Sequence, residues 1–387
     1  MNDQIFPLRD TDAEQIISMM AAFAHAGADM LMLLPRKWGR PAVTKQEIEV
    51  YYEVMVTFSI AAVRSSFPSF RGVEKISHGL RGTFANTFTS ADVIYTRNLP
   101  SVLTSLIMSS KPVVYETYRP WPDQQRILRP IIRWITRHPA FLGAVFHSKL
   151  AEDSFVKNGL PNNKSLVAYN GYNPKRMLPV LTKDAARRML NLPIGSHIVT
   201  YTGSMRLDKG LDIILNMAGI LPDIYFVLVG SCGYHEVEDR AQAIANVQIV
   251  PWQQFSETTP YLYASDVLII PPTAQPLEKV GTTVLPLKTF LYMATLRPIF
   301  GPATPDLLEI LKNDDNAVLV DPTDTVTSIC MTLDQFLKDP GKQAQLAAKA
   351  ASDVAALTWE NRGRQVLSFI KKRLTAYKCN TNNQRKI

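Results

Sequence analysis

Hydrophobic residues along this chain form short, nearly continuous runs of valine, isoleucine and leucine, and amphipathic stretches separate one run from the next. Such runs are typical of parallel strands that are covered on both faces of a sheet. The runs that predict strands are residues 30–34, 92–96, 112–116, 143–148, 165–170, 197–203, 224–230, 247–251, 266–272, 297–301 and 316–322. Their alternation with helical stretches predicts a doubly wound α/β architecture.

The strand–helix pattern occurs in two sets, and the chain of 387 residues exceeds what one hydrophobic core usually serves. A turn-rich break at residues 170–174 separates the sets, so we place a domain boundary near residue 175. Two Rossmann-like domains would place a ligand cleft at the carboxyl ends of their strands. The predicted segments are domains 1–175 and 176–360, a helix over 361–377, and a polar tail over 378–387 that we expect to be disordered.

Composition describes a soluble globular protein, with 46% hydrophobic and 20% charged residues. The three cysteines lie far apart without a Cys-x-x-Cys motif, so neither a disulfide framework nor a zinc site is indicated, and a reducing, cytoplasmic location is favoured. The net charge of +8 is too modest and diffuse to indicate nucleic-acid binding. It suits a phosphate-bearing substrate or an anionic membrane surface.

One basic, aromatic segment over residues 124–142 is a candidate for membrane contact. Its outward-facing residues would be Arg126, Arg129, Arg133, Trp134 and Arg137. A basic helix with an aromatic residue can lie on anionic lipid. Alternatively, the isoleucines of the segment pack in the core and its arginines are simply solvated.

Two basic loops of the second domain carry the signal for phosphate binding. The strand at 197–202 leads into Gly203, and a polar loop with Arg206 then reaches Lys209-Gly210 at the start of a helix. Further along, Pro286, Leu287 and Lys288 open a second helix. Glycine lets backbone approach a ligand closely, and a helix N-terminus with a nearby lysine attracts phosphate.

In these two loops the chain resembles the retaining glycosyltransferases of family four, which have the GT-B fold. That family carries a Gly-Arg-x-x-x-x-Lys-Gly loop and a Pro-Leu-Lys-x-Phe-Glu-Tyr-Met-Ala helix that grip the diphosphate of a nucleotide sugar. The matching residues here are Gly203, Ser204, Lys209, Gly210, Pro286, Leu287, Lys288, Phe290, Tyr292, Met293 and Ala294. Weaker matches in the family's order extend the resemblance over most of the chain.

The resemblance implies transfer of a sugar from a nucleotide-diphosphate sugar to a glycan or lipid-linked acceptor, with retention and without a metal or other cofactor. Arg206 and Lys209 would stabilise the leaving diphosphate. Glu116 and Tyr118 would lie beside the reacting sugar, although relatives often place a histidine at the tyrosine position. A phenol can bind a sugar hydroxyl but is a poor base at neutral pH.

Further expectations come from the same resemblance. The residues Asp10, Thr11 and Asp12 fill a loop that cups the acceptor, where relatives often carry glycine. The C-terminal helix is expected to cross back to the first domain. The location is expected to be cytoplasmic, with peripheral contact to the inner face of the membrane.

Four positions bear on whether the family chemistry is retained. Ser204 replaces the loop arginine, and Leu291 replaces the helix glutamate that binds ribose, a role leucine cannot perform. Thr283 stands where many relatives carry another glutamate, and Glu278 is a candidate substitute for ribose binding. Two hypotheses therefore remain: an active glycosyltransferase, and a catalytically weakened GT-B protein that acts in binding or as a scaffold. A dehydrogenase is disfavoured because Gly-x-Gly-x-x-Gly is absent.

Overall fold

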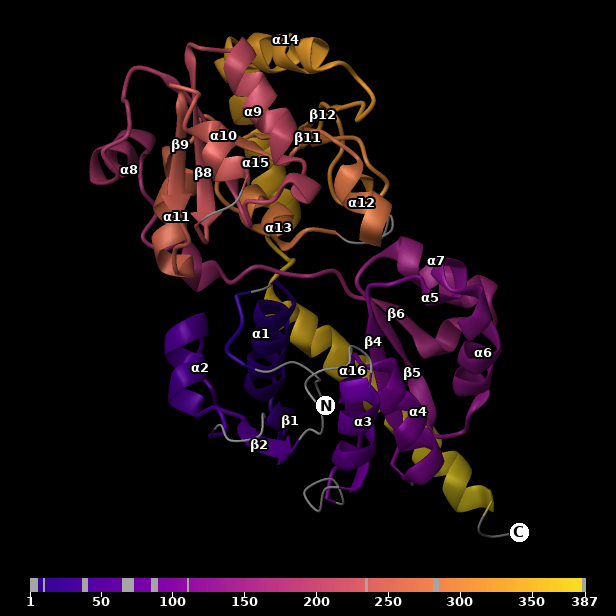
Figure 1. The fold of residues 1–387 in the computed structure, drawn as a ribbon. Helices are drawn as coiled ribbons and strands as arrows, with labels where there is room; N and C mark the ends of the chain where they lie inside the picture. The colour runs from indigo at the N-terminus through magenta and orange to yellow at the C-terminus, as the bar shows by residue number, and fades with distance from the viewer. Residues whose placement is uncertain are drawn as a thin grey trace. The chain divides into compact units, whose positions relative to one another are not determined.

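A computed structural model gives the structure of the protein, shown in Figure 1. It describes residues 6–9, 11–36, 41–64, 73–84, 90–109, 111–233, 236–280 and 285–384. The chain divides into two compact units. Unit 1 comprises Met1–Asn170 together with Trp359–Ile387, and unit 2 comprises Gly171–Thr358.

The strands of unit 1 are parallel and lie in two sheets, β1-β2 and β3-β4-β5-β6. The strands are β1 (Leu31–Arg36), β2 (Ser59–Arg64), β3 (Ile94–Thr96), β4 (Val113–Thr117), β5 (Phe141–Phe146) and β6 (Ser165–Val167). The helices are α1 (Thr11–His25), α2 (Lys45–Tyr52), α3 (Val73–Phe84), α4 (Leu99–Met108), α5 (Trp121–Gln124), α6 (Arg129–Arg137), α7 (Lys149–Lys157) and α16 (Trp359–Gln384).

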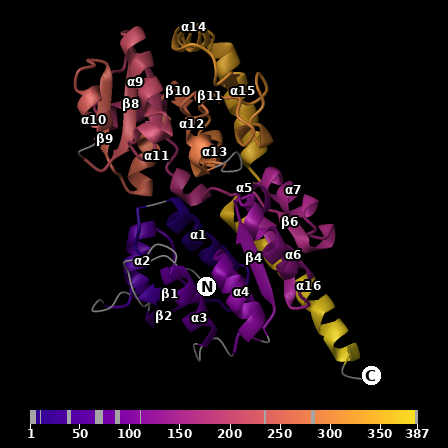
Figure 2. The same cartoon turned by 45° about the vertical axis from the view of Figure 1, so that its right-hand side comes forward.

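Helices cover both faces of the four-stranded sheet in unit 1. Apolar residues of α4, α6 and α7 form one core cluster with the sheet, and those of α1 and α16 form a cluster on the other side. In both views α16 runs along the length of unit 1 (Figures 1 and 2). The last helix of the chain therefore completes the core of the first unit.

Unit 2 contains one six-stranded parallel sheet in the order β12-β11-β10-β7-β8-β9. Its strands are β7 (His197–Thr202), β8 (Ile224–Ser231), β9 (Val247–Pro251), β10 (Val267–Ile269), β11 (Ile299–Pro302) and β12 (Val318–Val320). Its helices are α8 (Lys183–Met189), α9 (Leu211–Ile220), α10 (Glu236–Ala241), α11 (Phe255–Ala264), α12 (Gln275–Val280), α13 (Leu287–Met293), α14 (Val326–Leu337) and α15 (Pro340–Val354). Residues of α9, α10 and α14 pack on one face of this sheet, and residues of α8, α11 and α13 pack on the other.

The predicted doubly wound α/β fold is confirmed, and each predicted strand region contains a strand of the structure. The prediction missed β2, whose Ser-Ile-Ala-Ala-Val-Arg sequence is short and rich in alanine, a residue that is uncommon in strands. The units divide after Asn170, where the sequence placed the boundary near residue 175. No helix in the described part of the chain is both long and apolar enough to span a membrane.

The expectation of a disordered tail is wrong for residues 378–384, because α16 continues to Gln384. Tertiary contacts support this polar end of the helix. The ring of Tyr377 packs against the unit 1 core, and Lys378 Nζ donates to Asp92 Oδ1 at 3.2 Å.

Candidate active site

In unit 2, β7 and β10 are neighbours at the centre of the sheet. The chain proceeds outward from β7 through β8 to β9 and outward from β10 through β11 to β12, so the strand order reverses between β7 and β10. In an open parallel sheet, ligands bind at the carboxyl ends of the strands at such a switch point. The loop over residues 203–210 follows β7, and residues 271–273 follow β10. The loop that the sequence predicted to bind phosphate therefore lies at the switch point of the sheet.

Two glycines shape this loop. Gly203 has a φ of +142°, and a Cβ there would lie 2.8 Å from Lys288 Nζ and 2.9 Å from the Tyr201 hydroxyl. Gly210 has a φ of +77° and precedes α9, and its Cβ would lie 2.3 Å from Thr273 Cγ2. Only glycine accommodates these contacts, so both positions hold the loop close to its neighbours.

The helix α13 is fixed to the end of β7 by Tyr292. The buried phenol oxygen accepts a hydrogen bond from the backbone N–H of Thr202 at 2.8 Å. Burial raises the pKa of Tyr292 to about 12, so the phenol stays protonated at neutral pH. Because Thr202 directly precedes Gly203, this bond ties the two predicted phosphate-binding segments to each other.

Lys288 lies over the ring of Tyr201, with its Nζ 3.7 Å from the ring centroid. Burial, and then the positive charge of Lys209, lower the pKa of Lys288 well below its usual value. Lys288 forms no ion pair with any residue that the structure describes. Unit 2 thus brings together two lysines from the two predicted loops. Among the described residues, no carboxylate pairs with the amine of Lys288.

Arg206 forms an exposed ion pair within its own loop, and the role expected for it stays a prediction. Its Nε and Nη2 atoms donate to both carboxylate oxygens of Asp208, at 2.9 and 2.6 Å. A bidentate pair of this kind holds the guanidinium within its own loop and neutralises it. The acid two residues downstream was visible in the sequence, but its pairing was not.

Leu291 is half-buried and packs against an apolar cluster of unit 2 that includes Met177, Ala186 and Tyr263. Position 291 therefore belongs to the core beneath α13 and supplies no hydrogen-bond acceptor. The side chain of Ser204 is exposed, and its carbonyl oxygen accepts from the Tyr201 hydroxyl at 3.1 Å.

The remaining predicted donor residues fall around α13 and α12. Pro286 caps α13, and Leu287 is its buried first residue. Glu278 lies in α12, but its side chain is outside what the structure describes, as is the whole of Thr283.

In unit 1 the carboxyl ends of the strands meet in a buried polar network around Glu116. Glu116 Oε1 accepts from His147 Nε2 at 2.8 Å and from Arg362 Nη2 at 2.7 Å. Gln15 Nε2 lies 3.1 Å from His147 Nδ1 and donates to Asn170 Oδ1 at 2.7 Å. All five side chains are less than 5% exposed.

The electrostatics of the network assign a charge state to its members. Burial opposes ionisation of Glu116, but Arg362 and the hydrogen bond from His147 outweigh it and hold the pKa well below its usual value. Burial lowers the pKa of His147 to about 4 despite the nearby carboxylate. A neutral His147 that donates from Nε2 to a charged Glu116 satisfies both groups.

The structure therefore corrects the catalytic role predicted for Glu116. The carboxylate is 2% exposed and is occupied by His147 and Arg362, so it organises the strand ends. The sequence analysis missed Arg362, which lies almost 250 residues away in α16. It also missed Gln15, since no local pattern pairs either residue with Glu116.

Tyr118 lies next to this network and is half-buried, with its ring centroid 6.0 Å from that of His147. On the acceptor side predicted from the sequence, Asp12 Oδ1 lies 3.3 Å from Arg97 Nη2. Thr11 is the exposed first residue of α1, and Asp10 lies outside the described residues. Unit 1 thus brings Tyr118 and Asp12 into one region through Arg97, which the sequence analysis did not single out.

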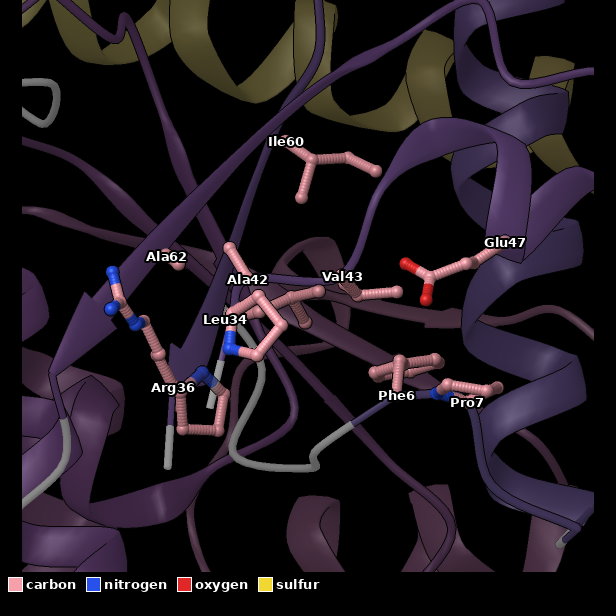
Figure 3. A pocket seen from close by; sticks show the side chains of 11 residues that line it. Phe6, Pro7, Leu34, Arg36, Ala42, Val43, Glu47, Ile60 and Ala62 are labelled. Atoms are coloured by element: carbon pink, nitrogen blue, oxygen red, sulfur yellow. The ribbon is translucent and has the colours of Figure 1, made fainter. Parts of the chain in front are cut away.

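A cavity of about 310 Å³ lies in unit 1 between the N-terminal segment, α2 and the strands β1 and β2. Figure 3 shows Phe6, Pro7 and Glu47 on one side of it and Arg36 on the other. The carboxylate of Glu47 is already bound by the backbone N–H and the hydroxyl of Thr44, at 2.7 and 2.8 Å. The cavity is otherwise mainly apolar, and none of the predicted site residues lines it.

The predicted membrane-facing residues lie in the 3₁₀ turn Arg126–Leu128 and in α6. Ile132 and Ile135 are buried in the core, while Arg126, Arg133, Trp134 and Arg137 are exposed. Arg129 is half-buried and donates from Nε to the carbonyl of Pro122 at 2.7 Å. This element therefore presents four of the five predicted residues on its exposed side.

Most of unit 2 matches a family of known proteins. Residues 196–339 match the family model for glycosyl transferases group 1. A D-inositol 3-phosphate glycosyltransferase of Xylanimonas cellulosilytica is 25% identical over 194 residues, which cover 48% of this chain and 44% of that protein. The match therefore spans less than half the length of that relative.

Solved glycosyltransferase structures share the fold over nearly the whole chain. Sucrose-phosphate synthase of Thermosynechococcus elongatus aligns with a TM-score of 0.76 and 16% identity, covering 97% of this chain and 98% of its own. The Anabaena protein HepE in complex with UDP-glucose aligns with a TM-score of 0.71 and 12% identity, covering 96% of this chain and 98% of its own. The expected GT-B fold is confirmed, and residues 196–339 match the family model for glycosyl transferases group 1.

Proposed function

We propose that this protein transfers a sugar from a nucleotide-diphosphate sugar to an acceptor hydroxyl. The GT-B fold and the match of residues 196–339 to glycosyl transferases group 1 support this proposal. HepE, a structural neighbour, was solved with UDP-glucose and with UDP, which supports a nucleotide sugar as the donor. The acceptor is proposed to be a glycan or a lipid-linked sugar.

The observation that carries this proposal is the position of Lys288. Its Nζ lies over Tyr201 and against Gly203 at the carboxyl end of β7, and burial, followed by the charge of Lys209, lowers its pKa. Two lysines without a described carboxylate partner at the switch point of a parallel sheet suit a diphosphate, which favours the protonated form of both. The diphosphate of the donor would supply the negative charge that neither lysine obtains from a described ion pair.

The chemistry needs stabilisation of charge more than it needs a base. As the bond between the anomeric carbon and the diphosphate oxygen breaks, negative charge grows on the leaving phosphate, and Lys209 and Lys288 would stabilise it. The acceptor oxygen forms the new bond on the same face of the sugar, and its proton passes to the departing phosphate oxygen. This retaining course requires no carboxylate nucleophile, in keeping with the burial of Glu116.

A catalytically weakened GT-B protein remains the second candidate, because Leu291 packs in the core and cannot bind ribose. Titration calorimetry with UDP, GDP and ADP, together with a panel of sugar nucleotides assayed for transfer and hydrolysis, separates the two candidates. We expect binding of one nucleotide and turnover of its sugar derivative. Nucleotide binding with no turnover would select the second candidate, and no binding of any of the three nucleotides would refute the nucleotide-sugar donor.

Lysine substitutions assign the site within that experiment. Lys288→Met and Lys209→Met should each weaken binding of the diphosphate by about tenfold or more, since each removes a charge-assisted contact. Lys338→Met is the matched control, because Lys338 is exposed on α14 and pairs with Asp334. The diphosphate site would be refuted if Lys288→Met and Lys209→Met bound the nucleotide as tightly as Lys338→Met.

Contact with an anionic membrane is proposed for the exposed side of α6 and the turn before it. Trp134 is 43% exposed and Ile127 is 81% exposed, and both lie among the exposed arginines. We expect the protein to sediment with vesicles that contain anionic lipid and not with neutral ones, and Trp134→Ala together with Ile127→Ser should weaken this binding. Equal sedimentation of the variant would argue against contact through this element.

A further inference from the structure

Three side chains at the carboxyl ends of β3 and β4 form a basic group beside the buried network of unit 1. The guanidinium carbons of Arg97 and Arg119 lie 5.7 and 5.6 Å from the centroid of the Tyr118 ring. Arg119 also lies 5.2 Å from the Trp121 ring, and its Nε is 3.4 Å from the Tyr118 hydroxyl. Two cations are thus gathered around one phenol on one end of the sheet.

The guanidinium of Arg97 has donor capacity that the protein does not use. Nη2 contacts Asp12 at 3.3 Å, whereas Nη1 is buried and has no hydrogen-bond partner among the described residues. An unpaired buried donor costs on the order of 1–3 kcal/mol, so such groups call for an explanation. A bound anion would satisfy it after a local shift, since Nη1 is covered by protein in this structure.

Arg119 is half-buried and forms no ion pair with the part of the chain that the structure describes. Its contacts are the aromatic faces of Tyr118 and Trp121, which orient the guanidinium without neutralising it. An arginine held this way presents its planar donor fork to a partner, a geometry that suits phosphate and carboxylate.

The charge balance of the surroundings leaves this group positive. Glu116 is paired with Arg362 and also attracts Arg97: burial opposes the charge of Arg97, but Asp12 and Glu116 together raise its pKa. Asp12 is the other acid recorded at this place, and its side chain is 43% exposed. Counted over the described residues Arg97, Arg119, Arg362, Asp12 and Glu116, the local charge is +1.

We infer that Arg97, Tyr118 and Arg119 form a site for an oxyanion, and that the acceptor is a sugar or polyol that carries a phosphate or a carboxylate group. The anion would accept from both guanidinium groups and from the Tyr118 hydroxyl. The diphosphate of the donor is assigned to the lysines of unit 2, so the anion of unit 1 belongs to the acceptor. This assignment to the acceptor depends on the proposed glycosyl transfer, although binding of the anion does not.

The test is calorimetric binding of glucose 6-phosphate, glucuronate and glucose to the full chain. We expect at least one of the two charged sugars to bind and glucose not to bind. Arg97→Gln and Arg119→Gln should each weaken that binding by about tenfold or more, because each removes a charged donor. Arg97→Lys should bind the charged sugar with an affinity between those of the wild type and Arg97→Gln. Lysine keeps the positive charge but lacks the planar pair of donors of a guanidinium group.

Controls separate failure of this site from failure of the proposed function. Arg133→Gln, on the exposed side of α6, should leave binding unchanged, and UDP affinity should be unchanged in every variant. Equal binding of glucose and both charged sugars, no binding of either charged sugar, or unaltered affinity in both the Arg97 and Arg119 variants would overturn the site. Failure of the wild-type protein to bind UDP, GDP or ADP would instead overturn the proposed function, while the charged sugars still test this site.

Discussion

Lys288 shows how its surroundings change the chemistry of one residue. Its amine lies 3.7 Å from the centroid of the Tyr201 ring, and burial followed by the charge of Lys209 lowers its pKa well below that of a solvated lysine. A lysine in this environment is easier to deprotonate in the free protein. A diphosphate beside it would reverse the shift, because an opposite charge favours the protonated form.

Diphosphate binding should therefore take up a proton. Near pH 8, where UDP itself does not titrate, we expect the calorimetric enthalpy of UDP binding to vary with the ionisation enthalpy of the buffer. Affinity should fall as pH rises above the lowered pKa of Lys288, because the free protein then lacks that proton. The Lys288→Met variant should lose the proton uptake, whereas the same buffer dependence in this variant would assign the proton to another group.

At the scale of an element, the loop between β7 and α9 is determined by what packs against it. Gly210 adopts a φ of +77° as the cap of α9, and its Cα faces Thr273 and Pro271 from the loop after β10. Tyr292 of α13 bonds to the backbone of Thr202 at the other end of the loop. The phosphate-binding loop thus owes its shape to two segments that are distant in sequence.

A matched pair of glycine substitutions tests this account. Gly210→Ala should destabilise unit 2 by roughly 1–3 kcal/mol, because the left-handed backbone is strained for alanine and its Cβ would meet Thr273. Gly219→Ala, on the same helix, meets nothing within 4 Å and should cost nothing or stabilise slightly. Urea denaturation measures the free energy of unfolding of each variant, and hydrogen exchange in β8 reports the stability of unit 2. Equal stability of the two variants would refute the packing argument.

At the scale of the whole molecule, α16 makes the first unit depend on the last part of the chain. Arg362 donates from Nη2 to Glu116 and from Nε to the carbonyl of Ala168 at 3.1 Å, and it is 3% exposed. The helix also packs its apolar residues against α1 and the sheet. Unit 1 is therefore complete only when Trp359–Ile387 is in place.

Loss of Arg362 should destabilise unit 1 and leave unit 2 unaffected. Arg362→Met leaves Glu116 buried beside one neutral partner, and breaking such a buried pair costs about 3–5 kcal/mol. We expect faster hydrogen exchange in β4 with unchanged exchange in β8, and partial recovery when Glu116→Gln is added. Arg364→Met is the control on the exposed side of α16, and a comparable effect there would assign the loss to the helix as a whole.

Local pattern in the sequence determined the parallel α/β fold, the strand positions and the two lysine loops of unit 2. These features follow from hydrophobic periodicity and from the chemistry of glycine, proline and lysine over a few neighbouring residues. The same local view predicted a disordered tail from residue 378, because it could not include the contact of Lys378 with Asp92.

Only the tertiary structure decided which charged side chains are available to a ligand. Arg206 is paired with Asp208 and Glu116 with Arg362, whereas Arg97 keeps a buried donor without a partner among the described residues. Residue type determines what a side chain can bind, but its pKa and its free donors depend on partners brought close by folding. Arg362 and Glu116 lie 246 residues apart in the chain, and no period in the sequence records their pairing.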